Sequence, residues 1–234
     1  MSERFFLETP LRGETCVLAG DEARHLAAVM RAAVGDEVVV FDGGGSEYLA
    51  SIASLRKQQV ELTIVERREV SRELHKELTL AVALPKGERQ KWLVEKATEL
   101  GVTRLVPLVT ERGVAQPVDA ALARLRRTVI EASKQCGRNH LLEIEVPQAA
   151  ISYFAAADPE STRWIGDASG GDFVAAQAGS SSVIAAIGPE GGFAPAEVAS
   201  ARDAGWQVVS LGKRILRVET AALAFAALAG LGDR

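Results

Sequence analysis

The sequence predicts an α/β protein with a small β-barrel at its N-terminus and a larger parallel-sheet domain after it. Short β-branched runs separated by glycines fill most of residues 1–70, a pattern typical of a small barrel. After residue 78, continuous apolar runs alternate with helical patterns, which indicates a parallel sheet with helices on both faces. The length of 234 residues accommodates two domains, which we place at residues 1–72 and 73–234.

The barrel is predicted from a few short elements. The expected strands are residues 36–42, 48–52 and 60–65, with a turn at 43–45. One helix interrupts them, for which Asp21 is the expected cap and Leu26, Val29 and Met30 the expected apolar face. The charged residues 66–74 are the expected linker.

The second domain is predicted from six apolar runs and the helices between them. The expected strands are residues 78–85, 103–110, 141–147, 162–167, 181–188 and 206–211. Trp92, Leu93, Ala97 and Leu100 recur at helical spacing before a stop at Gly101. The other expected helices are one from a cap at Asp119 to Gly137, a short Ala-rich one, one from Pro195, and a terminal one over 221–232.

Composition and charge exclude some classes of protein. An apolar fraction of 47% excludes wholesale disorder, a collagen and a coiled-coil rod. The net charge of −4 would argue against a nucleic-acid partner if it were spread over the chain. Residues 1–74 hold nine basic and thirteen acidic side chains, however, and so account for the whole of it. Residues 86–138 hold eleven basic and six acidic ones. That local excess fits either a phosphate-contacting surface or an ordinary salt-bridged helix face.

The compartment expected from the sequence is the cytoplasm. Cys16 and Cys136 form no CxxC pair and give no disulfide framework. The first residues lack the apolar core of a signal peptide, and the run 221–232 is too short to span a membrane. The three histidines show no metal-ligand spacing, so we expect no metal and no membrane partner.

Residues 187–198, IGPEGGFAPAEV, are the most informative stretch. They join a buried strand to a helix, and ligands of parallel sheets bind beyond the carboxyl ends of strands. Gly188, Gly191 and Gly192 lack Cβ atoms, so backbone can approach a ligand closely there. The stretch is neither a dinucleotide fingerprint nor a P-loop. A ligand loop and a plain strand-to-helix turn both remain open.

Residues 211–222, LGKRILRVETAA, form a second loop after a strand. Gly212 permits a tight departure from the strand, and three cations follow it. Glu219 and Thr220 then open a helix, which Thr220 can cap. Taken alone this is an ordinary basic loop, but two glycine-bearing loops after neighbouring strands favour a shared pocket.

Several motifs resemble one family. They are HLAAVMRAAVGDEVVVFDG from His25, LPKGERQKWLVEKATELGV from Leu84, TER at 110–112, EASKQCGR at 131–138, IGPEGGF from Ile187 and SLGKRILRVETAALA from Ser210. In this order they resemble the bacterial 16S ribosomal RNA uridine-N3 methyltransferases of the SPOUT superfamily. The resemblance implies an N-terminal PUA-like barrel, a trefoil-knotted SPOUT domain, a homodimer and S-adenosylmethionine as methyl donor.

The resemblance also implies the substrate and the site residues. The substrate would be uridine 1498 of 16S ribosomal RNA in the small ribosomal subunit. The implied cofactor-binding residues are Leu84, Pro85, Gly188, Pro189, Glu190, Gly191, Gly192, Leu211, Gly212, Ile215, Leu216, Arg217, Thr220 and Ala221. The expected RNA contacts are Arg12, Arg24 and Arg31 in the barrel, and Arg112, Gln135 and Arg138 by motif. Gly113 and Leu142 depart from the family pattern, which often has serine and proline there.

The expected chemistry is methyl transfer to N3 of a uracil. Arg217 is the candidate to stabilise the developing anion or anchor a phosphate, and Glu190 or Glu219 is the candidate proton acceptor or ligand anchor. Capping or structural roles for the two glutamates remain open. The alternatives for the protein are a SPOUT methyltransferase with another RNA target and a non-catalytic RNA-binding ribosome-assembly factor.

Overall fold

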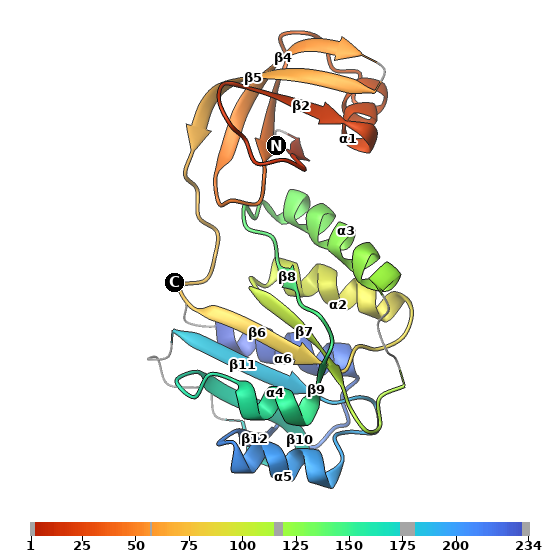
Figure 1. Cartoon of the computed structure of the whole chain (residues 1–234), viewed down its shortest axis with the longest axis vertical. Coiled ribbons are helices and arrows are strands. Elements are labelled where there is room, and N and C mark those ends of the chain that lie inside the picture. Colours follow the sequence, from red (N-terminus) through yellow and green to blue (C-terminus); the bar gives the residue numbers. More distant parts are fainter. Residues whose placement is uncertain (1–2, 57, 115–118, 174–180, 231–234) are drawn as a thin grey trace. The chain divides into compact units, whose positions relative to one another are not determined.

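The computed structural model describes residues 3–56, 58–114, 119–173 and 181–230 (Figure 1). The chain forms two compact units, Met1–Glu73 with Ser133–Leu141, and Leu74–Ala132 with Leu142–Arg234. The division predicted from the sequence, at residues 1–72 and 73–234, differs from these units at Glu73 and in one longer stretch. The contacts of Ser133–Leu141 place that segment in the first unit, although it is remote in sequence.

A curled sheet forms the first unit. Its strands within the described part of the chain are β1 (Arg4–Phe6), β2 (Thr15–Ala19), β3 (Glu37–Phe41), β4 (Glu47–Arg56) and β5 (Gln59–Arg68). The strand order is β1-β3-β4-β5-β2, and all pairs are antiparallel except β1 with β3. The order starts at β1 and ends at β2, so the barrel wall is open between these two edges and the sheet is a half-barrel.

Strands β1 and β2 were not predicted from the sequence, and the last barrel strand is longer than expected. Both missed strands are short, and β2 has only one buried residue, Leu18, so their hydrophobic pattern is weak. The strand β5 runs to Arg68, into the segment 66–74 that was expected to be a linker.

The helix of the first unit differs from the expected one. It starts as α1 (Gly20–Arg24) and continues as the π-helical turn η1 (His25–Val29). Ala19 occupies the cap position, so the expected cap Asp21 lies in the first turn instead. Leu26 is buried as expected, whereas Val29 is 69% exposed. A π-turn places residues at wider spacing than the 3.6 per turn of an α-helix, which rotates Val29 off the apolar face.

The second unit contains a parallel sheet. In the described residues its strands are β6 (Glu77–Val82), β7 (Arg104–Val109), β8 (Glu143–Ile144), β9 (Gln148–Ala149), β10 (Thr162–Asp172), β11 (Ser182–Ile187) and β12 (Gln207–Ser210). The order is β12-β10-β11-β6-β7-β8, with β9 also on β7. Every pair is parallel, as the continuous apolar runs predict.

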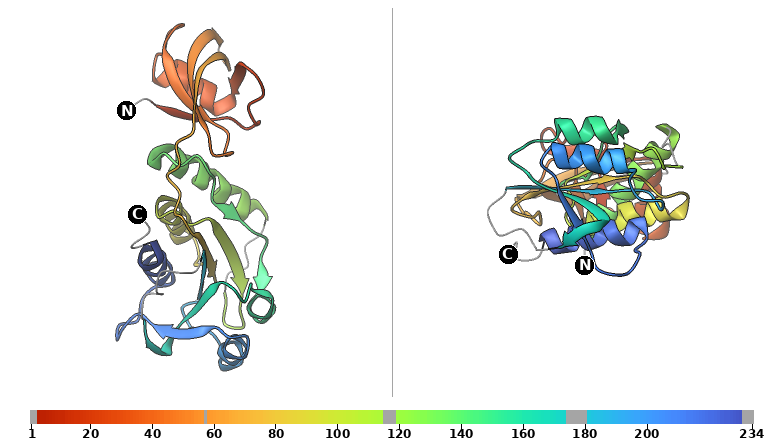
Figure 2. Two further views of the ribbon diagram at one scale, coloured as in Figure 1. Left: turned by 90° about the vertical axis from the view of Figure 1, so that its left-hand side faces the viewer. Right: turned by 90° about the horizontal axis from the view of Figure 1, so that it is seen from below.

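Helices cover both faces of this sheet. The described helices of the second unit are α2 (Glu88–Glu99), α3 (Asp119–Cys136), α4 (Ala150–Ala156), α5 (Pro195–Asp203) and α6 (Val218–Gly230). Residues 133–136 of α3 count with the first unit. The pair α4 and α5 lies on one face and the pair α2 and α6 on the other, as Figure 2 shows in its right-hand view. The predicted α/β class and helix-covered parallel sheet are therefore confirmed.

The apolar core on the α4–α5 face is aromatic. Phe154 and Trp206 pack edge to face with ring centroids 5.1 Å apart, and Phe154 meets Phe193 at 5.6 Å. The indole of Trp206 donates a hydrogen bond to the carbonyl oxygen of Phe154 at 3.1 Å. Because Phe193 ends the GPEGG stretch, this core fixes the far end of the loop that the sequence singles out.

The helices differ from the expected ones in their buried faces and in their first residues. Trp92 is 46% exposed, because the buried face of α2 is formed by Leu93, Val94 and Ala97. Helix α6 begins at Val218, earlier than expected, so Thr220 lies inside the helix and is not its cap. Asp119 is the first residue of α3, and the position before it lies outside the described residues.

Other expectations hold. Gly101 and Gly137 end α2 and α3 with positive φ angles of 82° and 85°. Pro195 occupies the first turn of α5. After β12 at the sheet edge, the chain returns to α6, which packs on β6 and β11 in the middle of the sheet. The expected trefoil knot depends on this crossing. No helix in the described ranges is both long and apolar enough for a membrane span.

Candidate active site

The segments that follow β6 and β11 leave the sheet side by side, whereas β10 separates β11 from β12, so the two predicted loops do not follow neighbouring strands. Strands β6 and β11 are parallel neighbours, with Val82 in register with Ile187. The backbone N–H of Ala83 donates to the carbonyl oxygen of Ile187 at 2.9 Å, just beyond the strand ends. The buried Leu84 and Pro85 therefore emerge beside Gly188 and Pro189, at the edge where ligands of parallel sheets bind.

The first glycine of the GPEGG loop occupies a site with no room for a side chain. A Cβ atom on Gly188 would lie 2.9 Å from the backbone nitrogen of Phe193 and 3.1 Å from its ring. Gly192 has a φ of +69°, and its N–H donates to the carbonyl oxygen of Pro189 at 2.8 Å. The loop is therefore a tight turn that requires glycine for two separate reasons, space at 188 and backbone angle at 192.

The second loop is open to solvent on one side and buried at its end. Gly212 has a φ of +105°, which favours glycine, and Ile215 is 98% exposed. Arg217 is also exposed, and its carbonyl oxygen accepts the N–H of Ala221 at 2.9 Å in the first turn of α6. Glu219 is only 5% exposed, although it lies two residues from Arg217.

Arg89, which is not among the candidates predicted from the sequence, connects the GPEGG loop to the first turn of α6. It lies in the first turn of α2, the helix that follows β6. One guanidinium nitrogen lies 3.0 Å from Glu190 in the GPEGG loop, and the other lies 3.8 Å from Glu219. The structure thus brings the two candidate glutamates to one cation. Because β6 and β11 are neighbours only in the folded sheet, no local motif could reveal this contact.

Glu219 has one carboxylate oxygen without a hydrogen bond among the described residues. Its Oε2 is buried and accepts no hydrogen bond among the described residues, since Arg89 is too far away for one. Buried carboxylate oxygens are normally hydrogen-bonded, so this oxygen is free to accept a further donor. The orientation of Glu219 therefore fits a ligand anchor better than a surface charge.

Arg112 lies against the first loop. Its Nη1 donates to the carbonyl oxygen of Gly191 at 2.9 Å, although its backbone follows β7. Close by, the buried Glu197 accepts the backbone N–H of Glu111 at 2.9 Å and that of Ala194 at 2.7 Å. These contacts tie the β7 end to the GPEGG loop and give Arg112, expected as an RNA contact, an intramolecular partner.

Gly113, which departs from the family pattern, suits the turn in which it lies. Its N–H donates to the carbonyl oxygen of Thr110 at 3.1 Å. A Cβ atom at this position would lie 2.7 Å from the Thr110 hydroxyl and 3.3 Å from that carbonyl oxygen. A serine here would therefore require the Thr110 side chain to rotate, and the glycine removes that conflict.

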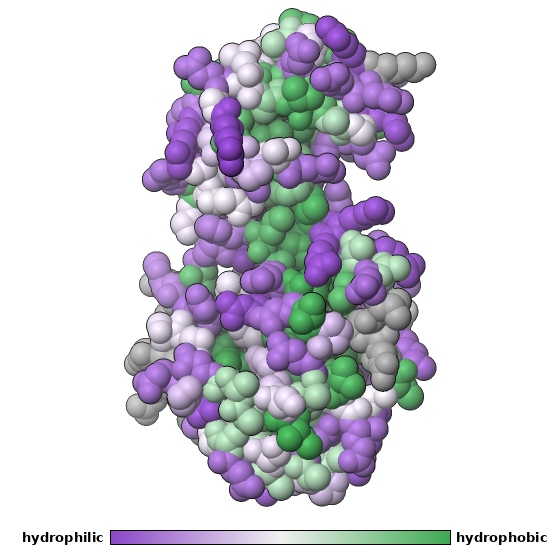
Figure 3. Space-filling view, viewed as in Figure 1, coloured by the Kyte–Doolittle hydropathy of each residue, from purple (hydrophilic) through white to green (hydrophobic). Residues whose placement is uncertain are grey.

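The remaining candidate RNA contacts divide into exposed and buried ones. Arg12, Arg31 and Gln135 are exposed, and Arg24 is exposed beside Asp21 at 3.3 Å. Arg31 has a φ of +55°, rare for a residue with a side chain. On the face in Figure 3, hydrophilic and apolar side chains are interspersed over each unit. Hydropathy on this face therefore does not single out an RNA-contact surface.

Arg138 is the buried exception. It is 3% exposed, and its guanidinium forms hydrogen bonds and an ion pair with Glu73. Its carbonyl oxygen and the side chain of Asn139 accept hydrogen bonds from Arg4. In this structure Arg138 thus holds the segment Ser133–Leu141 to the rest of the first unit, rather than facing solvent as an RNA contact would.

The site residues fit the expected cofactor in two respects. The crowded backbone at Gly188 forms a cradle that a Cβ atom would fill. The orphaned oxygen of Glu219 is an acceptor, and S-adenosylmethionine carries amino and hydroxyl donors. The residues that would hold the cofactor are therefore those of the three loops after β6, β11 and β12.

Family comparisons agree with this arrangement. An RNA methyltransferase domain matches residues 72–230, and an RNA methyltransferase PUA domain matches residues 18–65. The Synechocystis ribosomal RNA small subunit methyltransferase E is 35% identical, over 88% of this chain and 70% of its own. Its Bacillus subtilis counterpart is 30% identical, over 94% and 93%.

A solved structure extends the similarity to three dimensions. The ribosomal RNA small subunit methyltransferase E of Neisseria gonorrhoeae, bound to S-adenosyl methionine, superposes with a TM-score of 0.89 at 32% identity. The match covers 97% of this chain and 96% of that one. With the loops, the half-barrel and these matches together, the chain belongs to the RNA methyltransferase family that contains the ribosomal RNA small subunit methyltransferases E.

Proposed function

We propose that this S-adenosylmethionine-dependent RNA methyltransferase methylates N3 of one uridine in 16S ribosomal RNA, uridine 1498 by resemblance. Relatives that share most of its length are named for the small-subunit ribosomal RNA. The observation that carries the proposal is the position of Arg89, which lies 3.0 Å from Glu190 in the GPEGG loop and 3.8 Å from Glu219 in the first turn of α6. A ribosomal RNA substrate also places the proposed reaction in the cytoplasm, and the resemblance adds a homodimer.

The chemical problem is the proton on N3 of uracil, which must leave before or during attack. The cofactor supplies an electrophilic methyl group on a positively charged sulfur. The loops after β6, β11 and β12 would hold the cofactor and orient the target base, and such orientation provides a large share of the rate enhancement in many enzymes. The candidate proton acceptors are the carboxylates of Glu190 and Glu219.

Arg217 is the candidate to stabilise the uracil anion. It is exposed at the end of the second loop, two residues before the buried Glu219. A guanidinium there can donate to an oxygen on which negative charge develops, or to the phosphate of the target nucleotide. Both roles require Arg217 to face the RNA, and its exposure permits this.

The test uses small ribosomal subunits purified from a strain that lacks the gene. The purified protein and S-adenosylmethionine should produce N3-methyluridine, detected by mass spectrometry of the digested 16S ribosomal RNA at uridine 1498. The variant Arg217→Ala should reduce kcat by about 100-fold, as the loss of one oxyanion-stabilising donor does. Arg202→Ala, an exposed arginine on α5, is the matched control and should retain full activity.

The alternatives give different results in the same experiment. Methylation of transfer RNA alone, or of a ribose instead of a base, would assign another target. Failure to bind S-adenosylmethionine in calorimetry would indicate a non-catalytic RNA-binding factor. Persistence of N3-methyluridine in the deletion strain would contradict the proposed target.

A further inference from the structure

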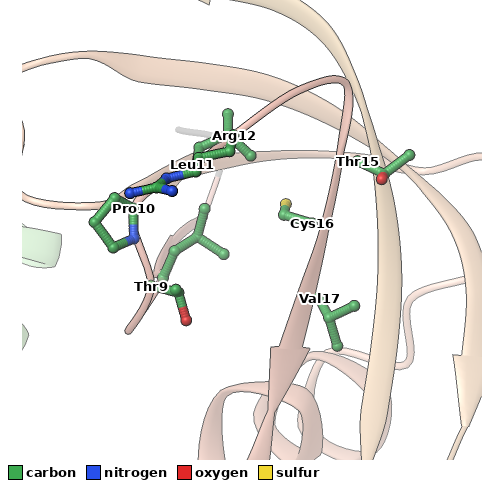
Figure 4. Close-up of a pocket in the computed structure, with 8 residues that line it drawn as sticks. Thr9, Pro10, Leu11, Arg12, Thr15, Cys16 and Val17 are labelled. Atoms are coloured by element: carbon green, nitrogen blue, oxygen red, sulfur yellow. The ribbon is translucent and has the colours of Figure 1, made fainter.

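A cavity of about 560 Å³ lies in the first unit, on the half-barrel (Figure 4). One wall is the connection between β1 and β2, at residues 7–12, and the other is β2 itself at residues 15–17. Strands β1 and β2 are the two ends of the strand order, so this cavity lies where the half-barrel is open. We call it the barrel slot. Its volume is within the range of about 300–1,000 Å³ that small-ligand pockets occupy.

Strand β2 presents backbone hydrogen-bonding groups along this opening. It pairs with β5 on one side, and Ile64 donates its N–H to the carbonyl oxygen of Glu14 at 2.8 Å. Antiparallel ladders alternate, so Cys16 bonds to β5 while Thr15 and Val17 direct their N–H and C=O groups away from it. Both of these residues line the barrel slot. The slot therefore has donors and acceptors in fixed positions on one wall.

The side chains of the slot combine apolar surface, hydroxyls and one cation. Leu7, Pro10 and Val17 supply apolar surface, and Val17 is 47% exposed. Thr9 and Thr15 add hydroxyl groups, and Arg12 adds an exposed guanidinium. A nucleotide has matching chemistry, because its base has apolar faces and a polar edge and its phosphate is an anion.

The wall that carries Arg12 is held in place. The backbone N–H of Leu11 donates to Oδ2 of Asp42 at 2.9 Å, and the other carboxylate oxygen of Asp42 accepts the N–H of Gly44 at 3.0 Å. The connection is thus tied to the turn after β3. A preformed wall reduces the entropy lost when a ligand binds.

We propose that the barrel slot binds one unpaired nucleotide of the RNA substrate, with the base against Val17 and the backbone edge of β2 and the phosphate on Arg12. This rests on the proposed RNA substrate and assigns it a second contact, away from the methyl-transfer loops. The lining residues 7–17 precede the segment 18–65 that matches the PUA domain. A peptide that paired with β2 as an added strand would need the whole free edge of β2. The connection 7–12 lies opposite Thr15–Val17 and closes the slot there, which favours a nucleotide over a peptide strand.

Four single variants test the slot in the full-length protein. Val17→Trp fills the slot, and Arg12→Ala removes its cation. The matched controls are Val65→Trp, at an exposed valine on β5, and Arg56→Ala, at an exposed arginine on β4. The KM for small subunits should rise about tenfold in both slot variants, while kcat and the Kd for S-adenosylmethionine stay within about twofold of wild type. Arg12→Ala should also lower the salt slope of RNA binding by about one.

Cross-linking tests the contact directly. Protein-free 16S ribosomal RNA containing 4-thiouridine is irradiated with the protein, and tryptic peptides are analysed by mass spectrometry. The peptide 13–24, between Arg12 and Arg24, should carry cross-linked nucleotide in wild type and lose it in Val17→Trp. Cross-links confined to other peptides, or slot variants that match their controls in KM, would overturn the proposal.

Two further outcomes separate the proposals. If the slot variants bind intact subunits weakly but bind protein-free 16S ribosomal RNA as wild type does, the slot takes a ribosomal protein and the nucleotide proposal is wrong. If wild type forms no N3-methyluridine, the proposed function fails, while the cross-link still decides whether RNA enters the slot.

Discussion

Arg89 shows how a single side chain can organise a site formed by distant segments. Its guanidinium contacts Glu190 at 3.0 Å and lies 3.8 Å from Glu219, so it links the first turn of α2 to the GPEGG loop and to α6. Arg89 is therefore a positioning residue in the proposed reaction. Its planar fork can reach two carboxylates at once, which a lysine ammonium does less well.

We expect Arg89→Gln to raise the Kd for S-adenosylmethionine about tenfold, because the loops lose their common cation. Arg89→Lys should recover part of the affinity, and Arg89→Gln combined with Glu190→Gln should cost less than the sum of the two. Isothermal calorimetry measures each value. Lys96→Gln is the control, since Lys96 pairs with Glu99 at 2.7 Å on the same helix. An equal loss in the control would indicate a general effect on α2.

Glu47 is the centre of a buried ion cluster in the first unit. Its side chain is 8% exposed and accepts hydrogen bonds from Arg4 and from Arg72, the latter at 3.1 Å. Burial acts to raise the pKa of Glu47, but the two arginines outweigh it and lower the pKa below its ordinary value of 4.5. A carboxyl with a depressed folded pKa stabilises the fold above its unfolded pKa and loses that effect as the pH falls through the folded pKa.

We therefore expect Glu47→Gln to lower the stability of the first unit by about 3 kcal/mol at pH 7, because it breaks a buried ion pair. The difference from wild type should shrink as the pH falls below about 4.5, where the carboxyl is protonated in the unfolded chain, and should be lost as the pH passes through the lower pKa of folded Glu47. Hydrogen exchange of the β3 and β4 amides reports on this unit. Glu69→Gln, which breaks an exposed pair with Arg67, should have little effect. A pH-independent difference would contradict the assignment.

Among the elements, the GPEGG loop was predicted from sequence and its geometry explains why. A strand that ends in glycine and a helix that begins with proline are local signals, so the sequence located the loop between β11 and α5. The π-turn η1 and the strand β2, by contrast, were not predicted from the sequence. Their conformation depends on packing against the rest of the sheet, which overrides weak local preferences.

We expect Gly188→Ala to weaken S-adenosylmethionine binding at least tenfold and to destabilise the second unit by about 2 kcal/mol, because its Cβ would press on the Phe193 backbone. Gly171→Ala in β10 is the matched control, since a Cβ there meets nothing within 4 Å and its φ is not positive. Calorimetry and thermal unfolding measure the two effects. Similar results for both glycines would show that the crowding at 188 is relieved without cost.

For the whole molecule, the distribution of charge matters more than its sum. Of the eleven basic residues in 86–138, at least five form ion pairs with described residues: Arg89 with Glu190, Lys96 with Glu99, Arg104 with Glu145, Lys134 with Glu22 and Arg138 with Glu73. The sequence left two interpretations of the positive excess in residues 86–138 open, a salt-bridged face and a phosphate-contacting surface, and each applies to part of the segment. The paired residues form salt-bridged surfaces, and they are unavailable as simple phosphate contacts.

We expect a moderate salt dependence of RNA binding for this reason. The logarithm of the association constant should fall against the logarithm of the salt concentration with a slope of about −2 to −4, equivalent to a few released counterions. Filter binding of 16S ribosomal RNA over a salt series measures this slope. A slope steeper than about −8 would require many more phosphate contacts than a local basic surface provides.

The sequence by itself determined the α/β class, the order of most strands and helices along the chain, and the positions of the two candidate ligand loops. These are local properties, set by hydrophobic period, glycine, proline and motif. Only the tertiary structure decided that Ser133–Leu141 belongs with the first unit, that the half-barrel is open at the slot, and that Arg89 joins Glu190 to Glu219. Each of these joins residues far apart in the chain. Such contacts depend on strand order and packing, which have no local signature in the sequence.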